Sequence, residues 1–177
     1  MPFPKPYADF VQRFRVPGGF LLLAAFFWFS QPTLESIALG LPVSLVGISI
    51  RGWAAGHLAK NQRLAMTGPY AHVRNPLYVG SLWMAGGVVI GARSWAMGLV
   101  FAAAFVLIYL PVIQLEEQHL RKLFPEYAAY AAKVPSLWPR LRGGGGSFSP
   151  ELYGRNKEWK AVSGYLLAVA WLVWKAQ

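Results

Sequence analysis

Long apolar segments alternate with polar stretches along the chain. Five segments consist mainly of apolar side chains: residues 16–30, 36–58, 77–90, 95–115 and 159–174. Because the hydrocarbon core of a bilayer is about 30 Å thick, a helix needs about 20 apolar residues to cross it. Segment 95–115 meets this length most clearly, whereas 16–30 and 77–90 are short. The pattern predicts an all-α fold, an integral membrane bundle of about five transmembrane helices.

Two polar regions separate these segments, at residues 51–76 and 116–158. The second begins with apolar side chains at helical spacing: Leu120, Leu123, Phe124, Tyr127 and Tyr130. This spacing predicts one amphipathic helix over residues 116–134, which ends at Pro135 and lies on the membrane or on the first polar region. Farther on, the four glycines at 143–146 favour a flexible linker over a hinge for the last helix.

The composition excludes several classes of protein. Of the 177 residues, 55% are hydrophobic and 14% are charged, against about 25% charged residues in a typical soluble domain. The chain has no cysteine, which excludes disulfides, thiolate metal sites and cysteine nucleophiles. His57 and His119 lack the spacing of metal ligands, so no metal site is expected. The net charge is +10, and the basic residues lie between the apolar segments. This position favours anionic lipid headgroups as partners and not nucleic acid.

The positive charges also predict an orientation. If the five segments cross the membrane in turn, all but two of the 17 Lys and Arg residues lie on one side, and Arg93 and Lys175 lie on the other. Loops rich in Lys and Arg stay in the cytoplasm. The sequence predicts a multi-pass membrane protein with its N-terminus in the cytoplasm and its C-terminus outside. If one of the short segments does not cross the membrane, the two termini lie on the same side.

A turn-rich, aromatic stretch at residues 64–80 leads directly into the third apolar segment. Gly68-Pro69 is typical of a turn, and Asn75-Pro76 is typical of a helix start. Free backbone N–H groups at such a start can bind a carboxylate. From sequence alone, helix capping at the membrane interface explains these residues equally well.

Two adjacent acids, Glu116 and Glu117, directly follow the fourth apolar segment. Ionisable groups at a membrane boundary are costly unless they are paired or functional. Adjacent helical residues point about 100° apart. We therefore expect one acid to face a ligand and the other to pair with Arg74, Arg121 or Lys122. The alternative is an ordinary solvated helix start.

Together the two clusters resemble the isoprenylcysteine carboxyl methyltransferase and phospholipid methyltransferase superfamily of integral membrane enzymes. Its pattern is Gly-x-Tyr, then Arg-His-Pro-x-Tyr-x-Gly, a helical hairpin, Glu-Glu, Leu-x-x-x-Phe, Tyr-x-x-Tyr and Val-Pro. This chain follows the pattern in order and spacing over about residues 56–139. The corresponding residues are Gly68, Tyr70, Arg74, Asn75, Pro76, Tyr78, Gly80, Glu116, Glu117, Leu120, Phe124, Tyr127, Tyr130, Val134 and Pro135.

The resemblance implies methyl transfer from S-adenosylmethionine, with S-adenosylhomocysteine as product. It implies a cytoplasmic cofactor pocket between the motif loop and the Glu-Glu helix. The residues implied to bind the cofactor are Lys60, Leu64, Ala65, Tyr70, Asn75, Pro76, Leu77, Tyr78 and Glu116. The implied catalytic group is Glu116, Glu117 and Arg74, in which Arg74 holds one acid in place or meets the carboxylate of the cofactor.

The same resemblance describes the chain as one methyltransferase domain over residues 1–177. The resemblance marks the cofactor-binding core (56–139), and the pattern of apolar and polar residues predicts the other parts: an N-terminal arm in the cytoplasm or at the interface (1–15), a loop (140–157) and a C-terminal transmembrane helix (158–177).

Two positions depart from the family pattern. Asn75 replaces the family histidine and cannot act as an acid or base near neutral pH. Val112 replaces an arginine with which eukaryotic prenylcysteine enzymes bind their substrate.

We expect direct displacement at the cofactor methyl group by a lipophilic acceptor from the membrane, aided by proximity, orientation and exclusion of water. An amine or thiol acceptor would need a base, for which Glu117 is the candidate.

Several functions remain open on the sequence alone. Among methyltransferases, the acceptor is a lipophilic carboxylate, a phospholipid amine or a small thiol. A steroid-reductase-like oxidoreductase would instead bind NADPH, and a non-catalytic membrane scaffold would tolerate the loss of Glu116. The sequence predicts no oligomeric state.

Overall fold

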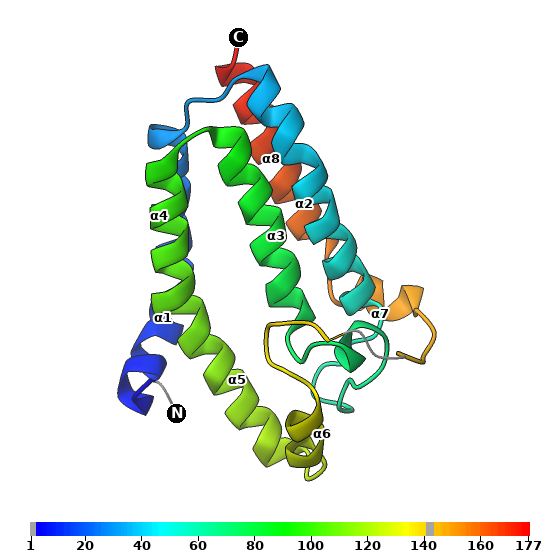
Figure 1. Cartoon of the computed structure of the whole chain (residues 1–177). Helices are drawn as coiled ribbons and strands as arrows, with labels where there is room; N and C mark the ends of the chain where they lie inside the picture. Colours follow the sequence, from blue (N-terminus) through cyan, green and yellow to red (C-terminus); the bar gives the residue numbers. More distant parts are fainter. Residues whose placement is uncertain (1–2, 141–143) are drawn as a thin grey trace.

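The computed structural model describes residues 3–140 and 144–177, except for the side chains of Arg15 and Val16. Every regular element in these ranges is helical, which confirms the predicted all-α fold (Figure 1). In chain order the elements are α1 (Lys5–Phe29), α2 (Leu34–Ala55), the 3₁₀ turn η1 (Gly68–Ala71), α3 (Pro76–Ala92), α4 (Trp95–Ala104), the π-helical turn η2 (Phe105–Tyr109), α5 (Leu110–Leu123), α6 (Tyr127–Lys133), α7 (Pro150–Arg155) and α8 (Trp159–Lys175).

The described helices are those of a membrane protein. By length and composition, α2 and the continuous helix Trp95–Leu123 are able to cross a bilayer. The bent α1 becomes a third span if its two parts, Lys5–Phe14 and Pro17–Phe29, count together. Helix α3 is apolar but has only 17 residues. The predicted number of about five spans is therefore not confirmed, although all five apolar segments form helices.

Helix α1 includes most of the segment predicted as an N-terminal arm, residues 1–15, so the described part of this arm is helical from Lys5 onward. Pro6 is tolerated in the first helical turn because its missing N–H would be unpaired there. The helix bends by 60° between Phe14 and Pro17, as expected where a proline interrupts the hydrogen-bond ladder.

Helices α2 and α3 form a close antiparallel hairpin through small residues. A side chain on Gly47 would overlap backbone atoms of Met84 and Gly80. One helical turn away, the Ser44 hydroxyl donates a hydrogen bond of 2.9 Å to the Met84 carbonyl. Small residues allow such close backbone approach between membrane helices. This hairpin carries α3, whose first turn lies at the candidate site.

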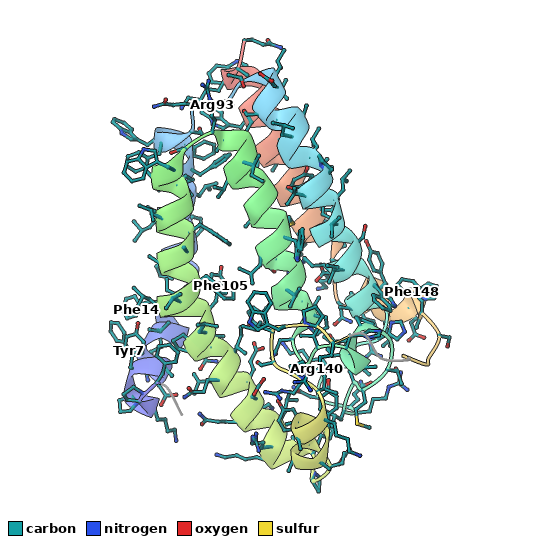
Figure 2. The ribbon with its side chains drawn as sticks, in the orientation of Figure 1. Tyr7, Phe14, Arg93, Phe105, Arg140 and Phe148 are labelled. Atoms are coloured by element: carbon teal, nitrogen blue, oxygen red, sulfur yellow. The ribbon has the colours of Figure 1, made fainter. Side chains whose placement is uncertain are left out.

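The continuous helix from α4 to α5 contains a π-helical turn before Pro111. Proline has no N–H, so it cannot bond the carbonyl four residues earlier, that of Leu107. The Tyr7 hydroxyl of α1 donates to this carbonyl at 2.8 Å. The Gln114 side chain exchanges two hydrogen bonds with the Phe3 backbone, at 2.9 and 3.3 Å. The start of α1 is thereby fixed to the part of α5 that leads to the acidic pair (Figure 2).

The second polar region differs from its prediction at two places. Residues 116–134 are not one helix, because α5 ends at Leu123 and α6 starts at Tyr127. Pro125 lies between them and breaks the helix by steric clash and by its missing N–H. The predicted loop 140–157 contains the short helix α7, for which Ser149 provides the N-terminal cap, accepting from the Leu152 N–H at 3.2 Å.

Helix α8 packs against α2 and α3 and is anchored by a buried ion pair. Arg51 of α2 contacts Glu158 through Nε and Nη2, at 2.9 and 2.8 Å. Its Nη1 also donates to the Ser81 hydroxyl and to the Leu77 carbonyl of α3. Arg51 thus ties three helices together close to the first turn of α3.

The two ends of the bundle carry different segments of the chain. Figure 1 shows the C-terminus together with the α1–α2 and α3–α4 connections at one end. Arg93 lies at this end, whereas Arg140 and Phe148 lie at the other (Figure 2). That other end carries the loop between α2 and α3, the end of α5, α6 and α7.

The close hairpin predicts different costs for two alanine substitutions in these glycine-rich helices. Gly47→Ala should lower the unfolding midpoint in detergent, because overpacking a tight contact costs about 1–3 kcal/mol. Gly86→Ala should leave it unchanged or raise it, because the added Cβ meets no atom within 4 Å and alanine favours a helix over glycine by about 1 kcal/mol. Equal effects of the two substitutions would contradict the close hairpin.

Candidate functional site

The predicted site residues converge at the end of the bundle that carries the loops. Those that contact one another come from the loop after η1, the first turn of α3 and the end of α5, and the segment that follows α6 meets them there (Figure 1). The segments lie far apart in sequence, and hydrogen bonds between Arg74, Asn75, Glu117 and Ser136 join them.

Arg74 and Glu117 form a two-pronged ion pair at the centre of the cluster. Arg74 Nε lies 3.1 Å from Glu117 Oε1, and Arg74 Nη2 lies 2.9 Å from Oε2. Both side chains are mostly buried, with 13% and 15% of their surface exposed. This confirms the expectation that one of the two acids pairs with a nearby base, and it selects Arg74.

Arg74 also closes the C-terminal end of α6. Its Nη1 donates to the carbonyls of Ala131 and Val134, at 2.9 and 2.7 Å, which otherwise lack helical partners. Burial alone would lower the pKa of the Arg74 guanidinium, but its hydrogen bonds and charge attraction to Glu117 outweigh burial and raise the pKa. Arg74 therefore stays charged and joins the loop, α5 and α6.

Asn75 occupies the predicted N-cap position of α3, but its side chain does not cap the helix. Instead Nδ2 donates to Glu117 Oε1 at 2.8 Å and to the Ser136 hydroxyl at 3.0 Å. Ser136 in turn donates to Glu117 Oε1 at 2.8 Å. The Glu117 carboxylate thus accepts from three different side chains. Sequence reasoning missed Ser136, for which the adjoining Val134-Pro135 motif was the only signal.

Backbone pairing supports this arrangement. The N–H of Arg74 donates to the carbonyl of Pro135 at 2.8 Å, and the N–H of Asn75 donates to that of Ser136 at 3.2 Å. Two residues before α3 therefore lie beside two residues after α6, which fixes Pro76, a fully buried residue at the first position of α3.

Glu116 points away from this network and is exposed. The Tyr78 hydroxyl donates to its Oε1 at 3.0 Å. The Tyr109 ring lies edge-on to the Tyr78 ring, with 6.3 Å between the ring centres. The adjacent acids therefore have separate environments, as their angular separation on a helix requires: Glu117 is held by three protein side chains, and Glu116 is accessible to a ligand.

Tyr70 lies in the η1 turn and is buried, with 6% of its surface exposed. Its carbonyl accepts a hydrogen bond of 2.7 Å from the Tyr130 hydroxyl. Burial raises the pKa of Tyr70 and Tyr130 well above the usual value for tyrosine. Burial, together with the Glu117 charge, raises the pKa of Tyr127 to about 12. The three phenols are therefore neutral at physiological pH.

Of the remaining predicted residues, three are half-buried and one, Lys60, is exposed. Leu64 packs against Tyr127 and Tyr130 in a small apolar cluster, and the half-buried Leu77 offers its carbonyl to Arg51. Ala65 is half-buried beside Leu64 in the chain. Lys60 is exposed in the turn after α2, and no ion pair found within the described ranges joins it to Glu116. Among the described residues, no group of three or more His, Asp or Glu lies close enough together to hold a metal ion.

Comparison with known proteins identifies the family. The family model for phospholipid methyltransferases matches residues 19–127. The chain belongs to the phospholipid methyltransferase family. The match contains Arg74, Asn75, Tyr78 and the Glu116-Glu117 pair, so this family membership confirms the predicted resemblance and supports methyl transfer as the class of reaction.

Three relatives extend the comparison. The chain is 35% identical to the cobalt-zinc-cadmium resistance protein CzcN of Cupriavidus metallidurans over 83% of its own length and 64% of the relative's. It is 35% identical to the nickel-cobalt-cadmium resistance protein NccN of Alcaligenes xylosoxydans xylosoxydans over 64% and 53%. It is 28% identical to a protein-S-isoprenylcysteine O-methyltransferase of Schizosaccharomyces pombe over 77% and 60%.

The chain therefore spans between about half and two thirds of the length of these relatives. No solved structure matches it.

The Arg74–Glu117 network predicts a large effect of removing either charge. Glu117→Ala should destabilise the protein by about 3–5 kcal/mol, because it leaves the guanidinium of Arg74 buried without its counter-charge. The unfolding midpoint in detergent measures this. Glu126→Ala is the matched control, since Glu126 is exposed on the same loop region. A midpoint of Glu117→Ala equal to that of the control would show that the pair does not hold the site together.

Proposed function

We propose that this protein transfers the methyl group of S-adenosylmethionine to a lipophilic acceptor that reaches the site from the membrane. The observation that carries the proposal is the separation of two adjacent acids. Glu117 is fixed by Arg74, Asn75 and Ser136, and this fixes α5 so that Glu116 stands accessible beside Tyr78. The family match supports the reaction class.

The chemistry of the residues present fits the cofactor. S-adenosylmethionine carries an ammonium group, a sulfonium centre and a ribose diol, and a carboxylate can serve each of these. Glu116 is the accessible carboxylate next to the motif loop, and the Tyr78 hydroxyl at 3.0 Å holds its orientation. The proposed binding residues are Lys60, Leu64, Ala65, Tyr70, Asn75, Pro76, Leu77, Tyr78 and Glu116.

When bound, the cofactor supplies an electrophilic methyl group. Glu116 and Tyr78 orient it, while the Arg74–Glu117 pair holds α5 against the loop that contacts it. The buried tyrosines Tyr70, Tyr127 and Tyr130 exclude water on the loop side. In this proposal the rate enhancement comes mainly from proximity and orientation of the two reactants.

The environment of Glu117 favours an acceptor that reacts without a base. Its carboxylate is already hydrogen-bonded by Arg74, Asn75 and Ser136, so removing a proton from an acceptor would break this network. A lipophilic carboxylate is ionised at neutral pH and needs no base. We therefore assign Glu117 a positioning role and favour a carboxylate over an amine or a thiol. The cation resistance named for two relatives does not identify an acceptor.

We further propose that the loop end of the bundle, with the N-terminus and the cofactor site, faces the cytoplasm and that the C-terminus lies outside. The excess of Lys and Arg supports this orientation. Arg93 lies at the end of the bundle that carries the C-terminus (Figure 2).

The absence of cysteine from the sequence provides a clean test of this orientation. A membrane-impermeant maleimide should label Gln177→Cys in intact cells, because this exposed residue would lie outside. It should label Glu126→Cys only after the cells are permeabilised. Labelling in the reverse order would overturn the orientation.

Transfer of a radiolabelled methyl group from S-adenosylmethionine into a membrane extract tests the function. The wild-type protein should give a labelled product that partitions into organic solvent. Glu116→Gln should reduce transfer at limiting cofactor by about ten-fold or more, because a hydrogen bond to a charged group is worth about 1.5–3 kcal/mol. Tyr78→Phe should have a smaller effect in the same direction.

The control for this assay is Glu126→Gln, which removes an exposed carboxylate outside the site. Wild-type activity of Glu116→Gln in folded protein would exclude Glu116 from the cofactor site. No labelled product from the wild-type protein with lipid carboxylates, amines and thiols all present would contradict the proposed reaction.

A further inference from the structure

The four glycines at 143–146 are not explained by the site described so far. Gly143 lies outside the described residues. The other three, Gly144, Gly145 and Gly146, lie against the η1 turn, Gly68–Ala71, and are called the glycine strap below. The Gly145 carbonyl accepts a hydrogen bond of 2.8 Å from the Gly68 N–H. The described part of the stretch is therefore exposed but bound to the turn, in contrast to the flexible linker that its composition predicts.

Hydrogen bonds on both sides hold the strap in place. On one side, the Arg140 N–H donates to the His72 carbonyl at 3.0 Å, and His72 Nδ1 lies 3.1 Å from the Arg140 carbonyl. On the other side, the Ser149 N–H donates to the Gly56 carbonyl at 2.9 Å. The segment that leads to α8 is thus bound to the chain before and after the η1 turn.

Two of the three strap positions require glycine. A Cβ on Gly144 would lie 2.8 Å from the Gly68 carbonyl oxygen and 3.1 Å from His72 Nε2. Gly146 has a φ of +105°, which side chains disfavour, and a Cβ there would lie 2.7 Å from Cβ of Thr67. A Cβ on Gly145 would meet nothing within 4 Å. Close approach to the η1 turn, and not general flexibility, therefore accounts for Gly144 and Gly146.

The η1 turn is held from its other sides as well. Gly68 itself has a φ of +58° and lies directly against the buried ring of His57. The Tyr130 hydroxyl binds the Tyr70 carbonyl at 2.7 Å. The strap supports the turn through the Gly68 N–H, which donates to the Gly145 carbonyl at 2.8 Å. The turn carries Tyr70, whose backbone therefore depends on contacts from His57 after α2, from Tyr130 of α6 and from the strap.

We propose that the glycine strap is a positioning element of the cofactor site: it sets the backbone of Gly68–Ala71 and thereby the affinity for S-adenosylmethionine. This inference rests on the proposed function. The strap acts through the turn and needs no contact of its own with the cofactor. It also links the C-terminal helix to the site, since the chain continues from the strap through α7 into α8.

Three alanine substitutions within one segment test the proposal. Gly144→Ala and Gly146→Ala should weaken binding of S-adenosylhomocysteine about ten-fold, measured by calorimetric titration of the full chain in detergent. Gly145→Ala is the matched control, because it makes the same change of residue in open space, and its dissociation constant should stay within about two-fold of wild type. Hydrogen exchange at the Gly68 amide should be faster in the first two variants and unchanged in the control.

The possible results separate the strap from the proposed function. If wild-type protein does not bind S-adenosylhomocysteine, the proposed function is overturned. The role of the strap in cofactor affinity is then overturned as well. If wild type binds and all three variants bind equally well, the function stands and the strap proposal is overturned.

A further variant tests the proposal if Gly146→Ala does not fold. Phe148 packs over Gly56 at the end of the strap segment, so Phe148→Ala loosens this anchor without adding atoms. Weaker binding by Phe148→Ala and Gly144→Ala, with an unfolding midpoint equal to that of Gly145→Ala, supports the proposal. Wild-type affinity of both variants overturns it.

Discussion

The ion pair between Arg74 and Glu117 is the interaction on which the candidate site depends. A buried ion pair stabilises a protein only when its remaining donors and acceptors are also satisfied. Here Asn75 and Ser136 donate to Glu117, and the last carbonyls of α6 accept from Arg74. One charged pair therefore fixes the loop before α3, the end of α5 and the turn after α6 relative to one another.

This arrangement determines what the neighbouring acid can do. Because Glu117 is held on one side of α5, Glu116 must point elsewhere, and it meets only the Tyr78 hydroxyl among the hydrogen bonds found in the described ranges. A carboxylate that is fixed in direction yet exposed is suited to a cationic or hydroxyl-bearing ligand. The matched family region, residues 19–127, contains the charged pair but ends before Ser136 and the glycine strap.

Much of the fold could be predicted because apolar patterning determines where helices form. The apolar run 77–90 lies within α3, Pro76–Ala92, and its start at Asn75-Pro76 follows from backbone chemistry alone. Pairing of one adjacent acid with a base was also predictable, since an unpaired charge at the membrane boundary is costly. The break at Pro125 was available in the sequence, but the helical spacing on both sides of it favoured one helix.

The contacts between segments that lie far apart in the sequence could not be predicted. Nothing in the sequence shows that Ser136 meets Glu117, that Tyr7 binds the Leu107 carbonyl or that Gly145 binds Gly68. Such contacts depend on the three-dimensional path of the chain, and carbonyl groups are the same at every residue. For the same reason, the glycines at 144–146 suggested flexibility although close packing explains two of them.

Equilibrium binding is the most direct test of a cofactor site beside Glu116. S-adenosylhomocysteine and NADPH would each be titrated into the detergent-purified protein and followed by calorimetry. A methyltransferase site should bind S-adenosylhomocysteine with micromolar affinity and should not bind NADPH. Binding of NADPH alone, or of neither ligand to folded protein, would contradict it.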